Sequence, residues 1–166
     1  MRRSRIFWIA AVVVISVAVV VVVTLALTPE EINPAGAAAA RFMNAAGKGD
    51  DAAALALLSD DMQAYVAANC PDGSVSACIN GYIPPEWGGL IKAVFRRAAP
   101  DGANWNVDLI ATYEKDTGVS GVCSYYRMEQ DAAGEWRIYG WAGFIWCGDG
   151  RSRNMATNPD TPNRVP

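Results

Sequence analysis

The chain has 166 residues, of which 52% are hydrophobic and 19% charged, and it carries a formal net charge of −3 with no histidine. The absence of histidine removes the usual general base near neutral pH and the usual imidazole metal ligand. The acidic balance argues against a nucleic-acid partner, and because P-loop, dinucleotide and calcium-loop motifs are missing we expect no cofactor and no metal.

A membrane span is predicted near the start of the chain. Residues 6–27 contain no charge, proline or glycine, and Arg2, Arg3 and Arg5 precede them. At about 1.5 Å per residue this run measures roughly 33 Å, enough to cross a hydrocarbon core of about 30 Å. The positive-inside rule places the arginines in the cytoplasm and everything after Thr28 outside. A cleaved signal peptide is the alternative, although the run is longer than a typical signal core.

The remaining chain has the length of one ordinary domain with a single core. It holds all seventeen acidic residues and eleven of the fourteen basic ones, a formal charge of −6. We divide the chain into a basic head and transmembrane helix at residues 1–28, a stalk at 29–34, an extracytoplasmic domain at 35–150 and a disordered tail at 151–166.

Helical segments are predicted at the front of this domain. An alanine-rich helix ends at Gly47, Asp50 or Asp51 caps a second helix, and Ser59 begins a third turn. These segments cover residues 35–46, 52–58 and 62–68. Together they predict a helical hairpin.

Four cysteines lie on the predicted outer side of the membrane, where thiols oxidise: Cys70, Cys78, Cys123 and Cys147. We expect two disulfides, because no C-x-x-C pair supports a zinc site. The sequence leaves three connectivities open, of which Cys70–Cys78 with Cys123–Cys147 is the simplest. Residues 69–85, with two of these cysteines and several prolines, are interpreted as a long irregular segment.

The second half of the domain changes periodicity. Residues 90–98 are predicted as a helix opened by Pro85 and ended by Pro100. Beyond them, alternation in twos with many β-branched and aromatic residues predicts an antiparallel meander. Its strands cover residues 105–114, 119–130 and 135–146.

Symmetric turns would place Glu114 opposite Val119 and Gln130 opposite Glu135. One face of the sheet is then almost wholly apolar or aromatic, with Trp105, Val107, Leu109, Ala111, Tyr113, Val122, Ser124, Tyr126, Met128, Tyr139, Trp141 and Ile145. The same register leaves Cys123 on the order of 15 Å from Cys147, beyond disulfide reach. Either a bulge near Gly140 or Gly143 corrects this, or the strand cysteines pair with the loop cysteines.

Residues 38–62 resemble the opening of nuclear transport factor 2-like domains. They contain a helix ending in aromatic and small residues, a glycine and aspartate turn, and a short helix ending in Leu-Leu-Ser. The resemblance extends over most of residues 35–149 and implies an α+β fold, a cone in which a curved antiparallel sheet wraps round the N-terminal helices. That family includes enzymes, such as ketosteroid isomerases and polyketide cyclases, as well as non-catalytic binding or assembly domains.

Candidate ligand-binding residues follow from the apolar face. Tyr113, Tyr126, Tyr139 and Trp141 would line a cavity, although buried tyrosines more often serve core packing, and Arg137 would reach its rim and meet an anion.

The other face offers no base. Asp108 is predicted to be a solvated surface residue, so no catalytic residue is assigned. Trp87, Trp136 and Trp146 are predicted to form an exposed aromatic patch.

The sequence therefore predicts a single-pass membrane protein anchored through residues 6–27, with its domain outside the cell membrane. We expect a non-catalytic binding or assembly module whose partner is a protein or a small apolar ligand. The alternative is an extracytoplasmic lyase, isomerase or small-ligand carrier that uses the cone.

Overall fold

The computed structural model describes residues 33–115 and 121–147, without the side chains of residues 142–146. The predicted head, membrane span and tail, and the stalk up to residue 32, lie outside these residues. None of the helices described is long and apolar enough to cross a bilayer.

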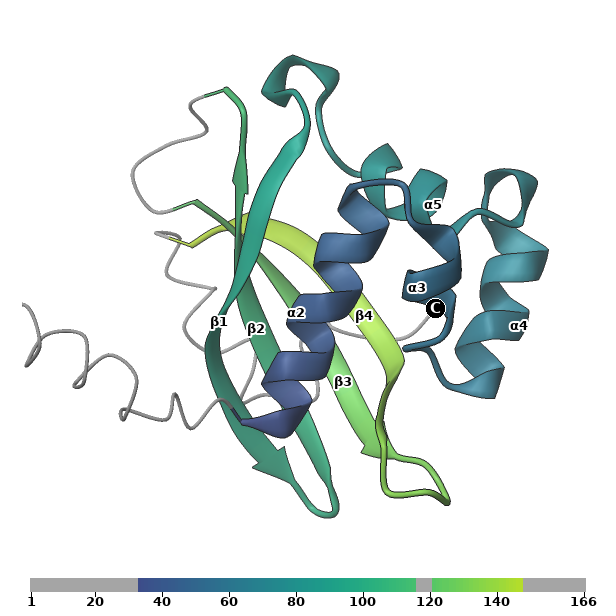
Figure 1. Cartoon of the computed structure of the whole chain (residues 1–166). Helices are drawn as coiled ribbons and strands as arrows, with labels where there is room; N and C mark the ends of the chain where they lie inside the picture. The colour runs from purple at the N-terminus through teal and green to yellow at the C-terminus, as the bar shows by residue number, and fades with distance from the viewer. Residues whose placement is uncertain (1–32, 116–120, 148–166) are drawn as a thin grey trace, which may run out of the picture. The chain divides into compact units, whose positions relative to one another are not determined.

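The fold is α+β, as predicted, with helices first and one antiparallel sheet after them (Figure 1). In chain order the elements are α2 (Pro34–Gly47), α3 (Asp51–Leu55), α4 (Asp60–Asn69), the 3-10 turn η1 (Pro71–Gly73), α5 (Val75–Gly81), the 3-10 turn η2 (Pro85–Trp87), β1 (Leu90–Asp101), β2 (Asn104–Tyr113), β3 (Val122–Gln130) and β4 (Trp136–Trp146).

Side-chain caps set the starts of the first three helices. Asn33 Oδ1 accepts from the N–H of Gly36, Asp50 Oδ1 caps α3, and Ser59 Oγ caps α4. Each cap satisfies a backbone donor that the first helical turn leaves without a partner. The three predicted helical segments are present, but α3 ends at Leu55, three residues before the predicted end, and Leu58 instead forms a β-bridge with Ile138. Asp50 rather than Asp51 is the cap of α3.

Part of the segment predicted to be irregular is a helix. Ser74 Oγ accepts from the N–H of Ala77 to start α5, and Val75 and Ile79 are buried beneath it. The Cys70–Cys78 disulfide links this helix to the end of α4. The prediction was wrong for α5 because the cysteines and prolines around it hid a short capped helix.

The predicted helix at residues 90–98 is wrong, because this segment is the edge strand β1. It pairs with β2 from Leu90↔Tyr113 to Asp101↔Asn104, and Gly102 adopts a φ of 63° in the two-residue hairpin loop. Alanine, lysine and arginine give the segment a helical preference of only a few tenths of a kcal/mol per residue. Pairing along β2 outweighs that preference.

The sheet has the order β1-β2-β3-β4, and its β2–β3 register is the predicted one, with Trp105 opposite Met128. The β3–β4 register begins one residue away from the prediction, with Gln130 opposite Trp136, and shifts again at two irregularities in the chain. These lie beside Gly140 and Gly143, where a bulge was expected, and they place Cys123 opposite Ile145.

Helix α2 lies across one face of the sheet (Figure 1). Its inner side is buried and consists of four alanines and two large side chains: Ala35, Ala38, Ala39, Phe42, Met43 and Ala46. Three contacts align it antiparallel to β1: Gly36 faces the ring of Phe95, Asn44 bonds Ala93, and Gly47 faces Leu90. The Asn44 amide binds both the carbonyl and the N–H of Ala93, which protects part of this sheet edge.

Candidate functional site

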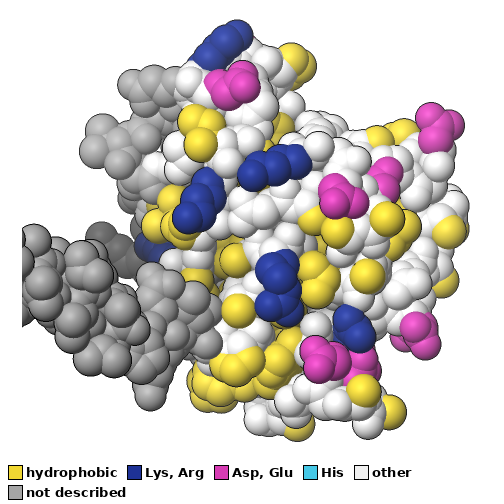
Figure 2. Space-filling view, in the orientation of Figure 1, with side chains coloured by type: hydrophobic (Ala, Val, Ile, Leu, Met, Phe, Trp, Pro, Cys, Tyr) yellow, Lys and Arg dark blue, Asp and Glu magenta, His cyan; other side chains and the backbone are white. Residues whose placement is uncertain are grey.

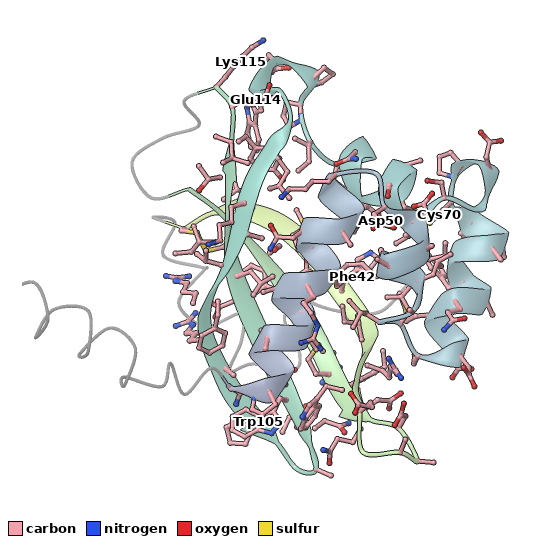
Figure 3. The ribbon with its side chains drawn as sticks, viewed as in Figure 1. Phe42, Asp50, Cys70, Trp105, Glu114 and Lys115 are labelled. Atoms are coloured by element: carbon pink, nitrogen blue, oxygen red, sulfur yellow. A yellow bond between two sulfur atoms is a disulfide. The ribbon has the colours of Figure 1, made fainter. Side chains whose placement is uncertain are left out.

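An aromatic cluster fills the middle of the helix-covered face. Phe42 of α2, labelled in Figure 3, meets the ring of Tyr126 edge-on at 5.6 Å between centroids and stacks on Trp141 at 5.8 Å. Tyr65 of α4 also contacts Trp141, edge-on, with 6.2 Å between ring centroids. The structure thus brings together two of the predicted cavity residues, Tyr126 and Trp141, and packs both against helices.

Three buried hydroxyls lie on this face, on Tyr113, Ser124 and Tyr126. None of them has a hydrogen-bond partner among the described residues. Burial raises the pKa of Tyr113 to about 12 and raises that of Tyr126 further above its usual range; the nearby Ser124 hydroxyl partly offsets the shift at Tyr126 without reaching hydrogen-bond geometry. The tyrosines are therefore neutral at physiological pH, and they can donate or accept a hydrogen bond but cannot serve as a base.

The structure does not bring Tyr139 to this cluster. The register shift in β4 turns Ile138 inward, fully buried, while Tyr139 lies on the opposite face with the Arg127 guanidinium 5.6 Å from its ring centroid. A slip of one residue moves a side chain to the other face of a strand, so the predicted position of Tyr139 on the apolar face is wrong.

Arg137 also lies away from the aromatic cluster. Its Nε donates to Asp131 Oδ2 at 2.9 Å and its Nη1 donates to the carbonyl of Ala56 at 2.6 Å. It lines an open pocket of about 470 Å³ at the α3–α4 turn, together with Ala56, Leu58, Ser59, Asp60, Asp61, Gln63, Glu129 and Asp131.

This pocket does not suit the anion predicted for Arg137. Four carboxylates line it against a single guanidinium. The pKa of Asp131 is lowered by the backbone N–H of Glu135 and by Arg137, which keeps this carboxylate ionised. The negative lining would repel an anionic ligand.

Asp108 lies on the face opposite α2, and the prediction that it is solvated is wrong. It is 0% exposed, and its Oδ2 accepts from Arg97 Nε at 2.8 Å and Arg96 Nη1 at 3.3 Å. Burial raises the pKa of Asp108, and Arg97 and Arg96 oppose this rise. The bulge between Phe95 and Arg97 lets two consecutive arginines reach one carboxylate.

Sequence reasoning missed this cluster because an aspartate among polar residues on an alternating strand normally marks a solvent face. The adjacent pair Arg96 and Arg97 was the available signal, but it lay in a segment predicted to be a helix. Oδ1 of Asp108 has no hydrogen-bond partner among the described residues.

Both disulfides of the simplest predicted connectivity are present. Cys70–Cys78 has a Cα separation of 5.1 Å and Cys123–Cys147 one of 5.0 Å. The second bond lies on the face of Asp108, where Arg96 Nη1 is 3.1 Å from Cys123 Sγ and Tyr125 is fully buried. The two bonds are consistent with an extracytoplasmic domain.

The predicted exposed aromatic patch is not seen in the part of the chain that the structure describes. Trp87 and Trp136 are partly buried against the core, and the side chain of Trp146 lies outside the described residues. Trp87 packs on Tyr113 with 5.6 Å between ring centroids.

Comparison of the chain with protein-family models, curated proteins and solved structures finds no match. Within residues 33–115 and 121–147 no group of three histidine, cysteine or acidic side chains is placed to hold a metal ion.

Proposed function

We propose that this chain is a membrane-anchored, extracytoplasmic, non-catalytic module for binding or assembly. The observation that carries the proposal is that aromatic side chains fill the middle of the helix-covered face of the sheet. Phe42, Tyr126 and Trp141 pack against one another there. Among the described buried residues of this face, Ser124 is the one polar residue apart from the tyrosines, and none is a carboxylate.

The location rests on two further observations. The uncharged run at residues 6–27 behind Arg2, Arg3 and Arg5 supports a single-pass anchor with a cytoplasmic N-terminus. The two disulfides support an oxidising compartment for the domain. The expected partner is another protein or a small apolar ligand.

The order of helices followed by a bulged antiparallel sheet, with α2 on one face, supports the resemblance to nuclear transport factor 2-like domains. We therefore propose membership of that superfamily.

A small-ligand carrier is the second candidate, and the buried hydroxyls of Tyr113, Ser124 and Tyr126 favour it. Buried polar groups are nearly always hydrogen-bonded to protein or to ordered water, so a bound molecule with an acceptor oxygen would satisfy them. A lyase or isomerase is less well supported, because the buried Asp108 lies on the other face beside two arginines.

The proposal is tested by topology. A reporter enzyme that is active only outside the cytoplasm should be active when it is fused after Pro166. The triple variant Arg2→Glu, Arg3→Glu and Arg5→Glu should strongly reduce that activity. The matched control replaces the three tail arginines, Arg151, Arg153 and Arg164, by Glu and should leave it unchanged. A wild-type fusion in which this reporter is inactive, while a second reporter that works only in the cytoplasm is active at the same position, contradicts the proposal.

A further inference from the structure

The helix-covered face of the sheet is longer than the helix that covers it. The first turn of α2 faces Phe95, and its last turn faces Leu90. Strand β1 continues from Phe95 for six more residues to Asp101. At about 3.3 Å per residue this leaves roughly 15–20 Å of sheet beyond the start of α2.

This end, which lies beyond α2, is mostly apolar on the helix side, with Gln130 opposite Trp136 as a polar residue there. Pro100 pairs with Trp105, which shares its face with buried Val107, and Ala98 is opposite Val107. Trp136 precedes buried Ile138 by two residues and so lies on the same face. We call Ala98, Pro100, Trp105 and Trp136 the overhang. Pro100 is exposed, and the other three pack against the core on one side and remain partly exposed on the other.

This end of the sheet is the lower one in Figures 1, 2 and 3. Hydrophobic side chains gather at the lower end of the domain in Figure 2, and Figure 3 labels Trp105 there. Both β-hairpin turns and the start of α2 lie at the same end (Figure 1). An apolar surface therefore lies at the end of the domain where α2 begins.

Ion pairs neutralise much of the charge near the overhang. Asp101 bonds Arg127 at 3.0 Å, and Asp131 bonds Arg137 at 2.9 Å. Glu129 and Glu135 add negative charge to the β3–β4 hairpin. This balance suits a zwitterionic lipid surface better than an anionic one.

The tether is short. The apolar run ends at Leu27, and the cap of α2 is Asn33, six residues later. Six extended residues reach at most about 20 Å, so a span that ends at Leu27 would limit how far the first turn of α2 can lie from the headgroups. Tryptophan is favoured at such interfaces because its ring is apolar and its N–H is polar.

We propose that the overhang lies against the outer lipid surface, with Trp105 and Trp136 in the headgroup region. The inference rests on the proposed membrane anchor and adds an orientation for the domain. The two β-hairpin turns point toward the bilayer, and Tyr113 and Trp87, at the other end of the sheet, point away from it.

The test uses the full chain with Trp8→Phe, reconstituted into phosphatidylcholine vesicles with or without lipid brominated near the headgroup end of the acyl chains. Bromine quenches nearby tryptophan fluorescence. Trp105→Phe with Trp136→Phe should remove at least half of the bromine-dependent quenching. The matched control is Trp87→Phe, a partly buried tryptophan at the other end of the sheet, which should preserve it.

Phenylalanine keeps an aromatic ring at each site. If the double variant does not fold, the same quenching measurement is made on the single variant Trp105→Phe. Equal quenching in the double and control variants, with protein that floats with the vesicles, overturns the orientation and leaves the anchor standing. Protein that does not float with the vesicles overturns the anchor and the orientation together.

Discussion

The two faces of the sheet are buried by different chemistry. On the face toward α2, Phe42, Tyr126 and Trp141 pack ring against ring, and the polar atoms there are neutral hydroxyls. On the other face, Asp108 is equally buried but ionic, with two arginines on one of its oxygens.

The difference shows that burial and polarity are separate properties of a strand position. Apolar burial is stabilised in proportion to the area removed from water. A buried carboxylate needs specific partners, since the loss of hydration is expensive. The first face should therefore tolerate pH change, and the second should respond to it.

The largest expected effect is on the aromatic face. Trp141→Ala should lower the free energy of unfolding by about 3–5 kcal/mol, because it removes the ring that Phe42 and Tyr65 both contact and opens a large cavity there. Denaturant unfolding followed by circular dichroism measures it. Trp141→Phe, the control, should cost much less; an alanine variant as stable as wild type would mean that the ring is not part of the core.

An intermediate effect is expected on the ionic face. Arg97→Met should cost about 2 kcal/mol at neutral pH, below the full value for a buried pair because Arg97 keeps a 33% exposed side chain. Arg127→Met is the control, since its partner Asp101 is 36% exposed, and it should cost about 1 kcal/mol or less.

The effect of Arg97→Met should depend on pH with a definite sign. Because the folded-state pKa of Asp108 is raised above its unfolded value, its contribution favours folding below about pH 4 and is lost as pH rises through the folded value. Removal of Arg97 raises this pKa further, so the cost should grow from acid to neutral pH. A cost that is constant across this range would show that Arg97 acts through packing alone.

The smallest effect concerns the buried hydroxyls. Tyr126→Phe should change the free energy of unfolding by about 1 kcal/mol or less, and in the stabilising direction if its hydroxyl has no partner in solution. Tyr65→Phe, a partly buried ring in the same cluster, is the control. A loss above about 2 kcal/mol would indicate a bound water or ligand at the hydroxyl and would strengthen the carrier alternative.

Several features could be predicted from the sequence because they depend on neighbouring residues. Ser59 and Asp50 cap the helices that follow them, and alternation from Trp105 onward defines β2 and its register with β3. Tyr126 and Trp141 were assigned to the packed face on the same evidence. The connectivity of the cysteines was one of three that the sequence allowed.

Tertiary structure decided the features that depend on pairing across the sheet. Residues 90–101 form a strand because β2 offers them a hydrogen-bonding edge, which outweighs a small helical preference. The irregularities beside Gly140 and Gly143 shift β4, and they turn Tyr139 away from the cluster.

The same bulges bring together groups that no local pattern relates. Arg96 and Arg97 reach Asp108 only because β1 is bulged at that point, and Cys147 reaches Cys123 only after the shifts in β4. A single inserted residue reverses which face every later side chain occupies. The sequence by itself therefore determined the starts of the first three helices, the apolar face of β2 and β3 and the need for two disulfides. The bulges, which depend on contacts between strands, decided which polar groups meet.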